Sequence, residues 1–168
     1  MKTVKVLVAA SMAAALLAGC GSKTDTDTFR FASELDIQGM DSTVVDDGMS
    51  YDAIHAITDG LTAVNDKGKT VPALAKSWDV SADGKTYTFH LRDAKWSNGD
   101  EVTANDFVYS WKKIIKNACT YAYMLGDDGA SVKNANQLID LGPKATDEQM
   151  NTLGVKATDD KTLVVELN

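Results

Sequence analysis

Residues 77–111 have the sequence SWDVSADGKTYTFHLRDAKWSNGDEVTANDFVYSW, and this stretch decides the fold. Asp83 and Gly84 lie between two β-prone runs, which predicts a hairpin because glycine accepts the positive φ that a tight turn requires. The predicted strands are Ser77–Val80 and Thr86–Arg92. Along the second strand, polar residues alternate with the apolar residues Tyr87, Phe89 and Leu91. The pattern therefore predicts a hairpin with one apolar face.

A helix is expected directly after this hairpin. Ser97–Asp100 predicts a turn, and Thr103 then precedes Asp106 by three residues, which is the spacing of an N-cap and its reciprocal capping partner. The helix should end near Asn117. Its expected buried stripe consists of Phe107, Trp111, Ile114 and Ile115, and its expected solvent face carries Lys112, Lys113 and Lys116. All three tryptophans are expected to pack internally: Trp78, Trp96 and Trp111.

The rest of the chain predicts short helices and strands in mixed order, so the expected fold class is α+β. Ser50 should cap a helix that ends near Thr58, and Pro72–Ala75 should form one helical turn with proline at its tolerated first position. Thr146 and Gln149 have the spacing of a capping box. The remaining expected elements are a helix at Asn134–Ile139, a hairpin of Leu61–Asn65 and Thr70–Val71, and strands at Phe29–Ser33, Val155–Thr158 and Thr162–Leu167.

The N-terminus has the pattern of a targeting segment. Lys2 and Lys5 precede the apolar run Val6–Leu17, which is too short to span a bilayer. The run ends in Leu-Ala-Gly-Cys at 17–20, which resembles the box of bacterial lipoprotein signal peptides. In that family the peptide is cut before the cysteine, here Cys20, and the cysteine sulfur carries a diacylglyceryl group. The alternative is an ordinary signal peptide that happens to end in Ala-Gly-Cys.

Composition and charge limit the class of protein. The 168 residues are 44% hydrophobic with a formal net charge of −7, which suits one globular domain. Removal of residues 1–19 takes away two lysines and no acid, so the net charge becomes −9. Such acidity argues against a nucleic-acid partner and against electrostatic adhesion to an anionic membrane. Cys119, the only other cysteine, has no partner for a disulfide and is expected to be a semi-buried structural thiol.

The sequence contains no recognisable catalytic apparatus. His55 and His90 are isolated histidines without partners at metal-ligand spacing, and no nucleophile elbow, P-loop or dinucleotide fingerprint is present. Adjacent aspartates such as Asp127 and Asp128 lie in predicted turns, where solvated acids are common. We therefore expect no enzyme activity, no metal and no cofactor. The residues alone leave open a binding protein, an adhesin or a structural component.

Three segments resemble the extracellular solute-binding proteins of family 5, and more narrowly the oligopeptide-binding lipoproteins of ABC importers. They are TDGL at 58–61, PALAKSWDVSADGKTYTFHLRDAKWSNGDEVTANDFVYSWKK at 72–113 and LGVKATDDKTLVVEL at 153–167. Two departures stand out. Asp59 occupies a position where the family usually has Glu, and the Asp-Pro segment that usually follows the long helix is absent from the sequence after Lys116.

The resemblance implies a partial periplasmic-binding-protein type II fold, in which two lobes close over the ligand. It divides the chain into a lipoprotein signal peptide (1–19), a polar tether (20–28), the N-terminal piece of lobe I (29–58) and an incomplete accessory domain (59–168). The apolar strand Thr162–Leu167 lies at the end of the sequence. For that reason we expect the chain to be a truncated, N-terminal fragment.

By resemblance, the function is that of a substrate-binding lipoprotein which captures extracellular oligopeptides and delivers them to an ABC permease. The protein is expected to be a monomer, held on the outer face of the cytoplasmic membrane by the lipid on Cys20. The implied ligand-binding residues are Asp46, Asp47, Gly48 and Met49, in a loop near the peptide N-terminus, and Tyr121 in the cleft wall. Open alternatives are another family-5 solute (a metal chelate, haem or a sugar) and a surface adhesin or signalling lipoprotein without a transport role.

Overall fold

The computed structural model describes residues 32–168, and Leu35–Asn168 forms a compact unit of its own. The predicted signal peptide, Cys20, the tether and residues 29–31 of the predicted strand Phe29–Ser33 lie outside the described residues. Ala32 and Ser33, at the end of that prediction, are in no strand, so this part of it is wrong. In the described part, runs of antiparallel strands are separated by a run of helices, which confirms the α+β class.

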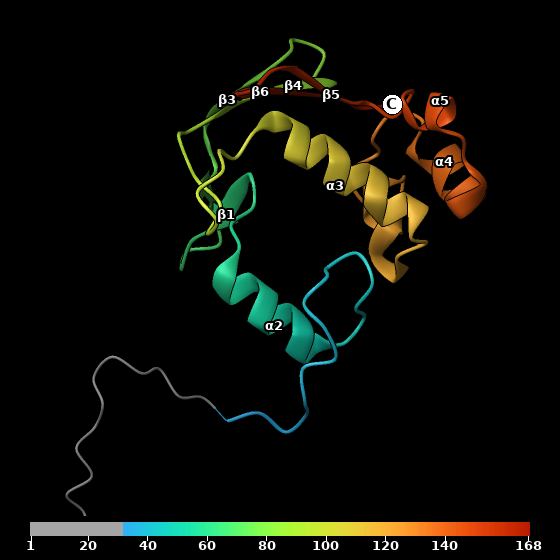
Figure 1. Ribbon diagram of the computed structural model, residues 1–168. Coiled ribbons are helices and arrows are strands. Elements are labelled where there is room, and N and C mark those ends of the chain that lie inside the picture. Colours follow the sequence, from blue (N-terminus) through green and yellow to red (C-terminus); the bar gives the residue numbers. More distant parts are fainter. Residues whose placement is uncertain (1–31) are drawn as a thin grey trace, which may run out of the picture. The chain divides into compact units, whose positions relative to one another are not determined.

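The predicted hairpin forms two strands of a four-stranded antiparallel sheet (Figure 1). In spatial order, the strands are β3 (Ala75–Val80), β4 (Thr86–Leu91), β6 (Thr162–Glu166) and β5 (Val155–Asp159). Gly84 has a φ of 73° in the turn between β3 and β4, as the Asp-Gly signal predicts. Trp78 lies opposite Phe89 in the register of this pair. The hairpin prediction is therefore confirmed.

A second, two-stranded sheet pairs β1 (Thr62–Val64) with β2 (Thr70–Pro72). The predicted helical turn at Pro72–Ala75 is wrong, because Pro72 ends β2, Ala73 and Leu74 form a bend, and β3 begins at Ala75. The backbone N–H of Leu74 donates to the carbonyl of Gly60, and that of Ala75 donates to Leu61. The φ of proline suits an extended strand edge as well as a helix start. The hydrogen bonds to Gly60 and Leu61, in an earlier segment, therefore decide the conformation.

The predicted long helix is α3 (Ala104–Lys116), which lies along one face of the four-stranded sheet (Figure 1). Thr103 is its N-cap residue, and the Asp106 carboxylate accepts a hydrogen bond of 2.7 Å from the backbone N–H of Thr103. The other helices are α2 (Gly48–Ile57), η2 (Thr120–Leu125), α4 (Ala135–Leu141), η3 (Gly142–Lys144) and α5 (Asp147–Met150). The core between helices and sheet includes the fully buried side chains of Ile115, Val132, Leu138 and Leu163.

The three lysines of α3 do not form the solvent face that the sequence predicts. Lys112 donates a hydrogen bond of 2.7 Å to the Asn151 side chain, and Lys113 lies 2.7 Å from the Asp41 carboxylate. Lys116 donates to the carbonyl oxygen of Ala145. All three side chains are half-buried, because other segments fold back over this end of the helix. A helix periodicity cannot predict such contacts, since the partners are distant in the sequence.

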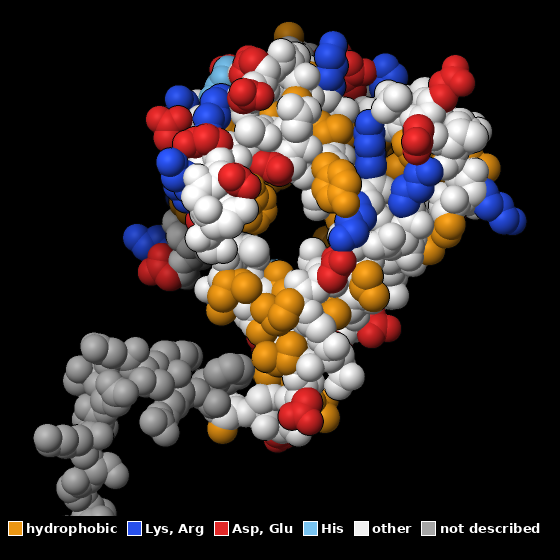
Figure 2. Space-filling view, in the orientation of Figure 1, with side chains coloured by type: hydrophobic (Ala, Val, Ile, Leu, Met, Phe, Trp, Pro, Cys, Tyr) orange, Lys and Arg blue, Asp and Glu red, His pale blue; other side chains and the backbone are white. Residues whose placement is uncertain are grey.

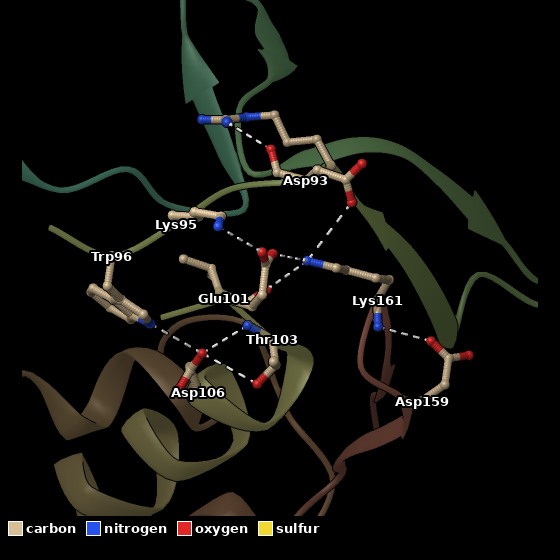
Figure 3. A network of polar contacts seen from close by, with 10 residues as sticks. Asp93, Lys95, Trp96, Glu101, Thr103, Asp106, Asp159 and Lys161 are labelled. Carbon is tan, nitrogen blue, oxygen red and sulfur yellow. Dashed lines mark hydrogen bonds and ion pairs between the residues drawn. The ribbon is translucent and has the colours of Figure 1, made fainter. Parts of the chain in front are cut away.

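Trp96 lies at the surface, so the prediction of internal packing is wrong for this residue. Its side chain is 47% exposed, whereas Trp78 and Trp111 are half-buried. The turn that follows is closed by a backbone hydrogen bond from Trp96 to Asp100, and the indole N–H lies 3.4 Å from the Asp106 carboxylate (Figure 3). The turn therefore directs the indole outward, while its polar edge is held at the start of α3.

Ion pairs attach the loop around Trp96 to the turn between β5 and β6 (Figure 3). The ammonium group of Lys161 lies 3.4 Å from the Glu101 carboxylate and donates to the carbonyl of Val102 at 3.0 Å. Glu101 also lies 3.5 Å from Lys95. The two Lys161 contacts connect residues about sixty positions apart and make the loop part of the scaffold.

Candidate functional site

The first of the predicted binding segments lies at the start of α2. Asp47 is the N-cap residue, and its Oδ1 accepts a hydrogen bond of 2.8 Å from the backbone N–H of Ser50. The prediction of Ser50 as N-cap is therefore wrong, and the segment predicted as the loop Asp46–Met49 includes the first turn of the helix. Ser50 is fully buried, and its Oγ accepts hydrogen bonds from two backbone N–H groups of the preceding loop, at Gln38 and Gly39.

A pocket of about 550 Å³ lies beside α2, and we name it the α2–η2 pocket. Helix α2 contributes residues at positions i, i+3, i+4 and i+7, which lie on one helical face. Residues of α3, of η2 and of the loop before α2 complete the wall. The lining residues are Ser42, Gly48, Tyr51, Asp52, His55, Ile114, Cys119, Tyr121, Met124 and Leu125. Most of these side chains are apolar or aromatic, as in pockets that hold small organic ligands.

Aromatic rings form the floor of the α2–η2 pocket. The rings of Tyr51 and Tyr121 are 5.2 Å apart between centroids and nearly perpendicular at 88°, which is a favourable edge-to-face geometry. The Tyr51 hydroxyl donates a hydrogen bond of 3.1 Å to the carbonyl of Ser42. Burial raises the pKa of Tyr51 to about 12, so its hydroxyl is a neutral donor at physiological pH. The His55 ring is tilted against that of Tyr51, at a centroid distance of 6.1 Å.

Two of the five predicted binding residues line this pocket. Gly48 and Tyr121 line it, and the Tyr121 hydroxyl lies 3.5 Å from the backbone carbonyl oxygen of Asp46. Asp46 is exposed and Met49 is half-buried, and neither side chain lines the pocket. Asp47 is engaged by the helix, because hydrogen bonds from the side chain and backbone of Ser50 hold the pKa of Asp47 below its ordinary value.

Sequence reasoning missed several lining residues. Tyr51, Asp52 and His55 share a helical face with Gly48, so a periodicity argument that started at Gly48 would have found them. His55, which the sequence shows only as an isolated histidine, is exposed and lines the pocket. Ser42, Met124 and Leu125 carry no signal in the sequence, because only the tertiary fold brings them to α2. Cys119, predicted to be a semi-buried thiol, is buried and contributes to the lining of the pocket.

A second hollow, of about 430 Å³, lies between α2, β1 and α3 and opens at the centre of the view in Figure 2. None of the predicted binding residues lines it. Its wall includes the apolar side chains Ile54, Leu61, Leu74, Trp96, Phe107 and Trp111. The α2–η2 pocket remains the candidate site, because it joins the predicted residues to an aromatic wall.

The α2–η2 pocket has the chemistry of a binding site. Its wall can pack against an apolar or aromatic group, and Asp52 contributes an exposed carboxylate to the lining, where it can attract a cation such as an ammonium group. Within residues 32–168, no cluster of three or more His, Cys, Asp or Glu side chains is arranged to hold a metal ion. No helix of the same residues is long and apolar enough to cross a bilayer.

Comparison with known sequences identifies a family. Residues 69–168 match the bacterial extracellular solute-binding proteins, family 5 (Middle). A relative in Lactococcus lactis, described as a dipeptide-binding protein, is 40% identical over 99% of this chain. The match covers 30% of that relative, so the chain spans less than a third of its length.

Solved structures agree with the family match. The substrate-binding domain of an oligopeptide ABC transporter from Bacillus anthracis superposes with a TM-score of 0.72 and 39% identity, over 82% of this chain and 26% of that one. Haemophilus influenzae OppA, in complex with the peptide RPPGFSPFR, gives a TM-score of 0.69 and 38% identity, over 78% of this chain and 25% of that one. The described fold is therefore a quarter or so of the larger fold in these structures.

Proposed function

Because the chain belongs to family 5 of the bacterial extracellular solute-binding proteins, we propose that it is part of a lipoprotein which captures oligopeptides outside the cell and delivers them to an ABC permease. The peptide-binding relatives support the proposed ligand class. We assign residues 29–58 to the N-terminal piece of lobe I and residues 59–168 to an accessory domain. The relatives are more than three times as long, and we expect the opposing lobe to supply the rest of the ligand contacts.

One observation carries the site proposal. Tyr121 and the segment Asp46–Met49 are far apart in the sequence, yet the Tyr121 hydroxyl lies 3.5 Å from the Asp46 carbonyl at the α2–η2 pocket. We propose that this pocket meets the N-terminal part of a bound peptide. The exposed Asp46 carboxylate would attract the peptide ammonium, and Tyr51 and Tyr121 would pack against a side chain.

Isothermal titration calorimetry with mixed short peptides tests this function in the whole protein. We expect binding by the wild type and about three- to tenfold weaker binding by Tyr121→Ala, which removes one aromatic wall. Tyr109→Ala is the matched control, since Tyr109 is an exposed tyrosine of α3 that does not line the pocket. The 168-residue chain alone should bind no peptide measurably, because it spans only 30% of a dipeptide-binding relative. A wild-type protein without any heat of binding would contradict the proposed ligand class.

The lipid anchor is a separate part of the proposal. We propose that Cys20 is acylated after cleavage of residues 1–19 and holds the protein at the outer face of the cytoplasmic membrane. Metabolic labelling with radioactive palmitate should label the wild type and leave Cys20→Ser unlabelled. Cys119→Ser is the matched control, because Cys119 is the other cysteine of the chain and is buried. Label that persists in Cys20→Ser would refute acylation at this residue.

A further inference from the structure

Two side chains at the C-terminal end of α3 hold the loop that precedes α2. The Lys113 ammonium lies 2.7 Å from Asp41 Oδ2, and the Asn117 side-chain amide donates a hydrogen bond of 2.8 Å to Thr43 Oγ1. Asp41 and Thr43 are themselves joined, because the Thr43 hydroxyl donates to Asp41 Oδ1 at 2.7 Å. The four side chains form a connected clamp between segments more than seventy positions apart in the sequence, and we call it the α3 clamp.

The α3 clamp is continuous with the α2–η2 pocket. The carbonyl of Ser42, between the two clamped residues, accepts the hydrogen bond from Tyr51 and lies 3.8 Å from the Cys119 sulfur. Farther along the loop, Val45 is buried, and the carbonyl of Asp46 faces Tyr121. Both ends of the loop 41–46 are therefore attached, one to α3 and the other to the pocket. The attachment to α3 fixes where the segment Asp46–Met49 begins.

The electrostatics of the α3 clamp favour a positional role. Hydrogen bonds from Lys113 and Thr43 lower the pKa of Asp41 to about 2, so the pair is charged throughout the physiological range. Both partners remain partly exposed, at 33% for Lys113 and 46% for Asp41. Ion pairs of this exposure contribute little to global stability, because water screens them. The Lys113–Asp41 contact can still hold the loop 41–46 in one position against α3, because its two partners belong to different segments.

We propose that Lys113 and Asn117 are positioning residues that hold the loop 41–46 so that Asp46–Met49 stays at the α2–η2 pocket before ligand arrives. This inference rests on the proposed function for its effect on peptide binding. A loop that is already fixed spares the ligand the entropy of ordering it, so the clamp should raise affinity without touching the peptide. Its loss should mainly speed dissociation, as most interface changes do.

Hydrogen exchange on the full chain tests the positional part without any ligand. The probes are the backbone amides of Val44 and Val45, which donate to the Asp41 carbonyl, and that of Ser50, which donates to Asp47. We expect Lys113→Met to speed exchange at these amides several-fold. Lys112→Met is the matched control, because this neighbouring lysine bonds to Asn151 instead. Equal exchange in the two variants would overturn the inference.

Peptide affinity in the whole protein tests the functional part, with the same mixed short peptides as probe. Lys113→Met should bind about fivefold more weakly than Lys112→Met, at an unchanged Tm. In a double-mutant cycle, Asp41→Asn, which keeps an acceptor for Thr43, should weaken binding further by little once Lys113 is Met, because both changes break the same contact. Unchanged affinity in Lys113→Met overturns the inference when the wild type binds. A wild type that binds no peptide contradicts the proposed function instead. In that case the hydrogen-exchange measurement alone tests whether the α3 clamp positions the loop 41–46.

Discussion

Gly129 is the position at which one added methyl group should disturb the candidate site most. A Cβ at this residue would meet the Met124 carbonyl group, at 2.5 Å from its carbon and closer still to its oxygen, and would lie 2.6 Å from the Met124 Cα. These are backbone atoms, so no side-chain rotation relieves the overlap. Met124 belongs to η2 and lines the α2–η2 pocket, and the backbone of η2 must therefore move.

The magnitude follows from that geometry. Overpacking typically costs about 1–3 kcal/mol, and a backbone overlap belongs at the upper end, so Gly129→Ala should lower the free energy of unfolding by about 3 kcal/mol. For a chain of this size, the fall in Tm should be about 6–12 °C. Urea denaturation followed by circular dichroism measures the difference.

Gly68→Ala is the control, because it adds a methyl group at a glycine where the new Cβ would meet no other atom. Gly68 has a φ of +70°, and no atom lies within 4 Å of the position that a Cβ would take, so only backbone strain should count, at about 1 kcal/mol. If the two variants lose equal stability within about 0.5 kcal/mol, η2 does not pack against Gly129 as described, and the reasoning is refuted.

Three further predictions use the same denaturation assay. Leu163 is fully buried on the inner strand β6, so Leu163→Ala should cost about 3 kcal/mol, and a cost below that of the exposed Ser77→Ala, about 0.5 kcal/mol, would contradict the core assignment. Ser50→Ala leaves two backbone N–H groups without their acceptor and should cost about 2 kcal/mol; a neutral result would argue against the described loop. Hydrogen bonds from Lys113 and Thr43 lower the pKa of Asp41 from 3.8 to about 2, so the carboxylate binds protons more weakly in the folded chain. Its stabilisation is present above about pH 4 and lost as the pH falls towards about 2. Because water screens the contact, the stabilisation from the charged Asp41 side chain is about 1 kcal/mol or less. The Asp41→Asn variant should lack this pH-dependent loss of stability between about pH 4 and about pH 2.

Local signals in the sequence predicted most of the regular structure. The Asp-Gly turn, the alternation along β4 and the Thr103–Asp106 spacing each involve a few neighbouring residues, and the structure contains all three. The family resemblance likewise comes from a contiguous motif. Predictions failed where two local solutions were nearly equivalent. Asp47 and Ser50 are both good N-cap residues, and Pro72 suits a helix start or an extended edge, so long-range contacts made the choice.

The sequence by itself determined the α+β class, the hairpin, the capped helix α3 and the family. The tertiary structure alone decided that Trp96 is exposed, that the lysines of α3 bind other segments, and that Tyr51 joins the predicted residues at one pocket. The physical reason is the range of the interactions. Turns and caps are satisfied within a few residues, whereas the α2–η2 pocket depends on contacts such as that of Tyr121 with Asp46, whose partners meet only after the chain has folded.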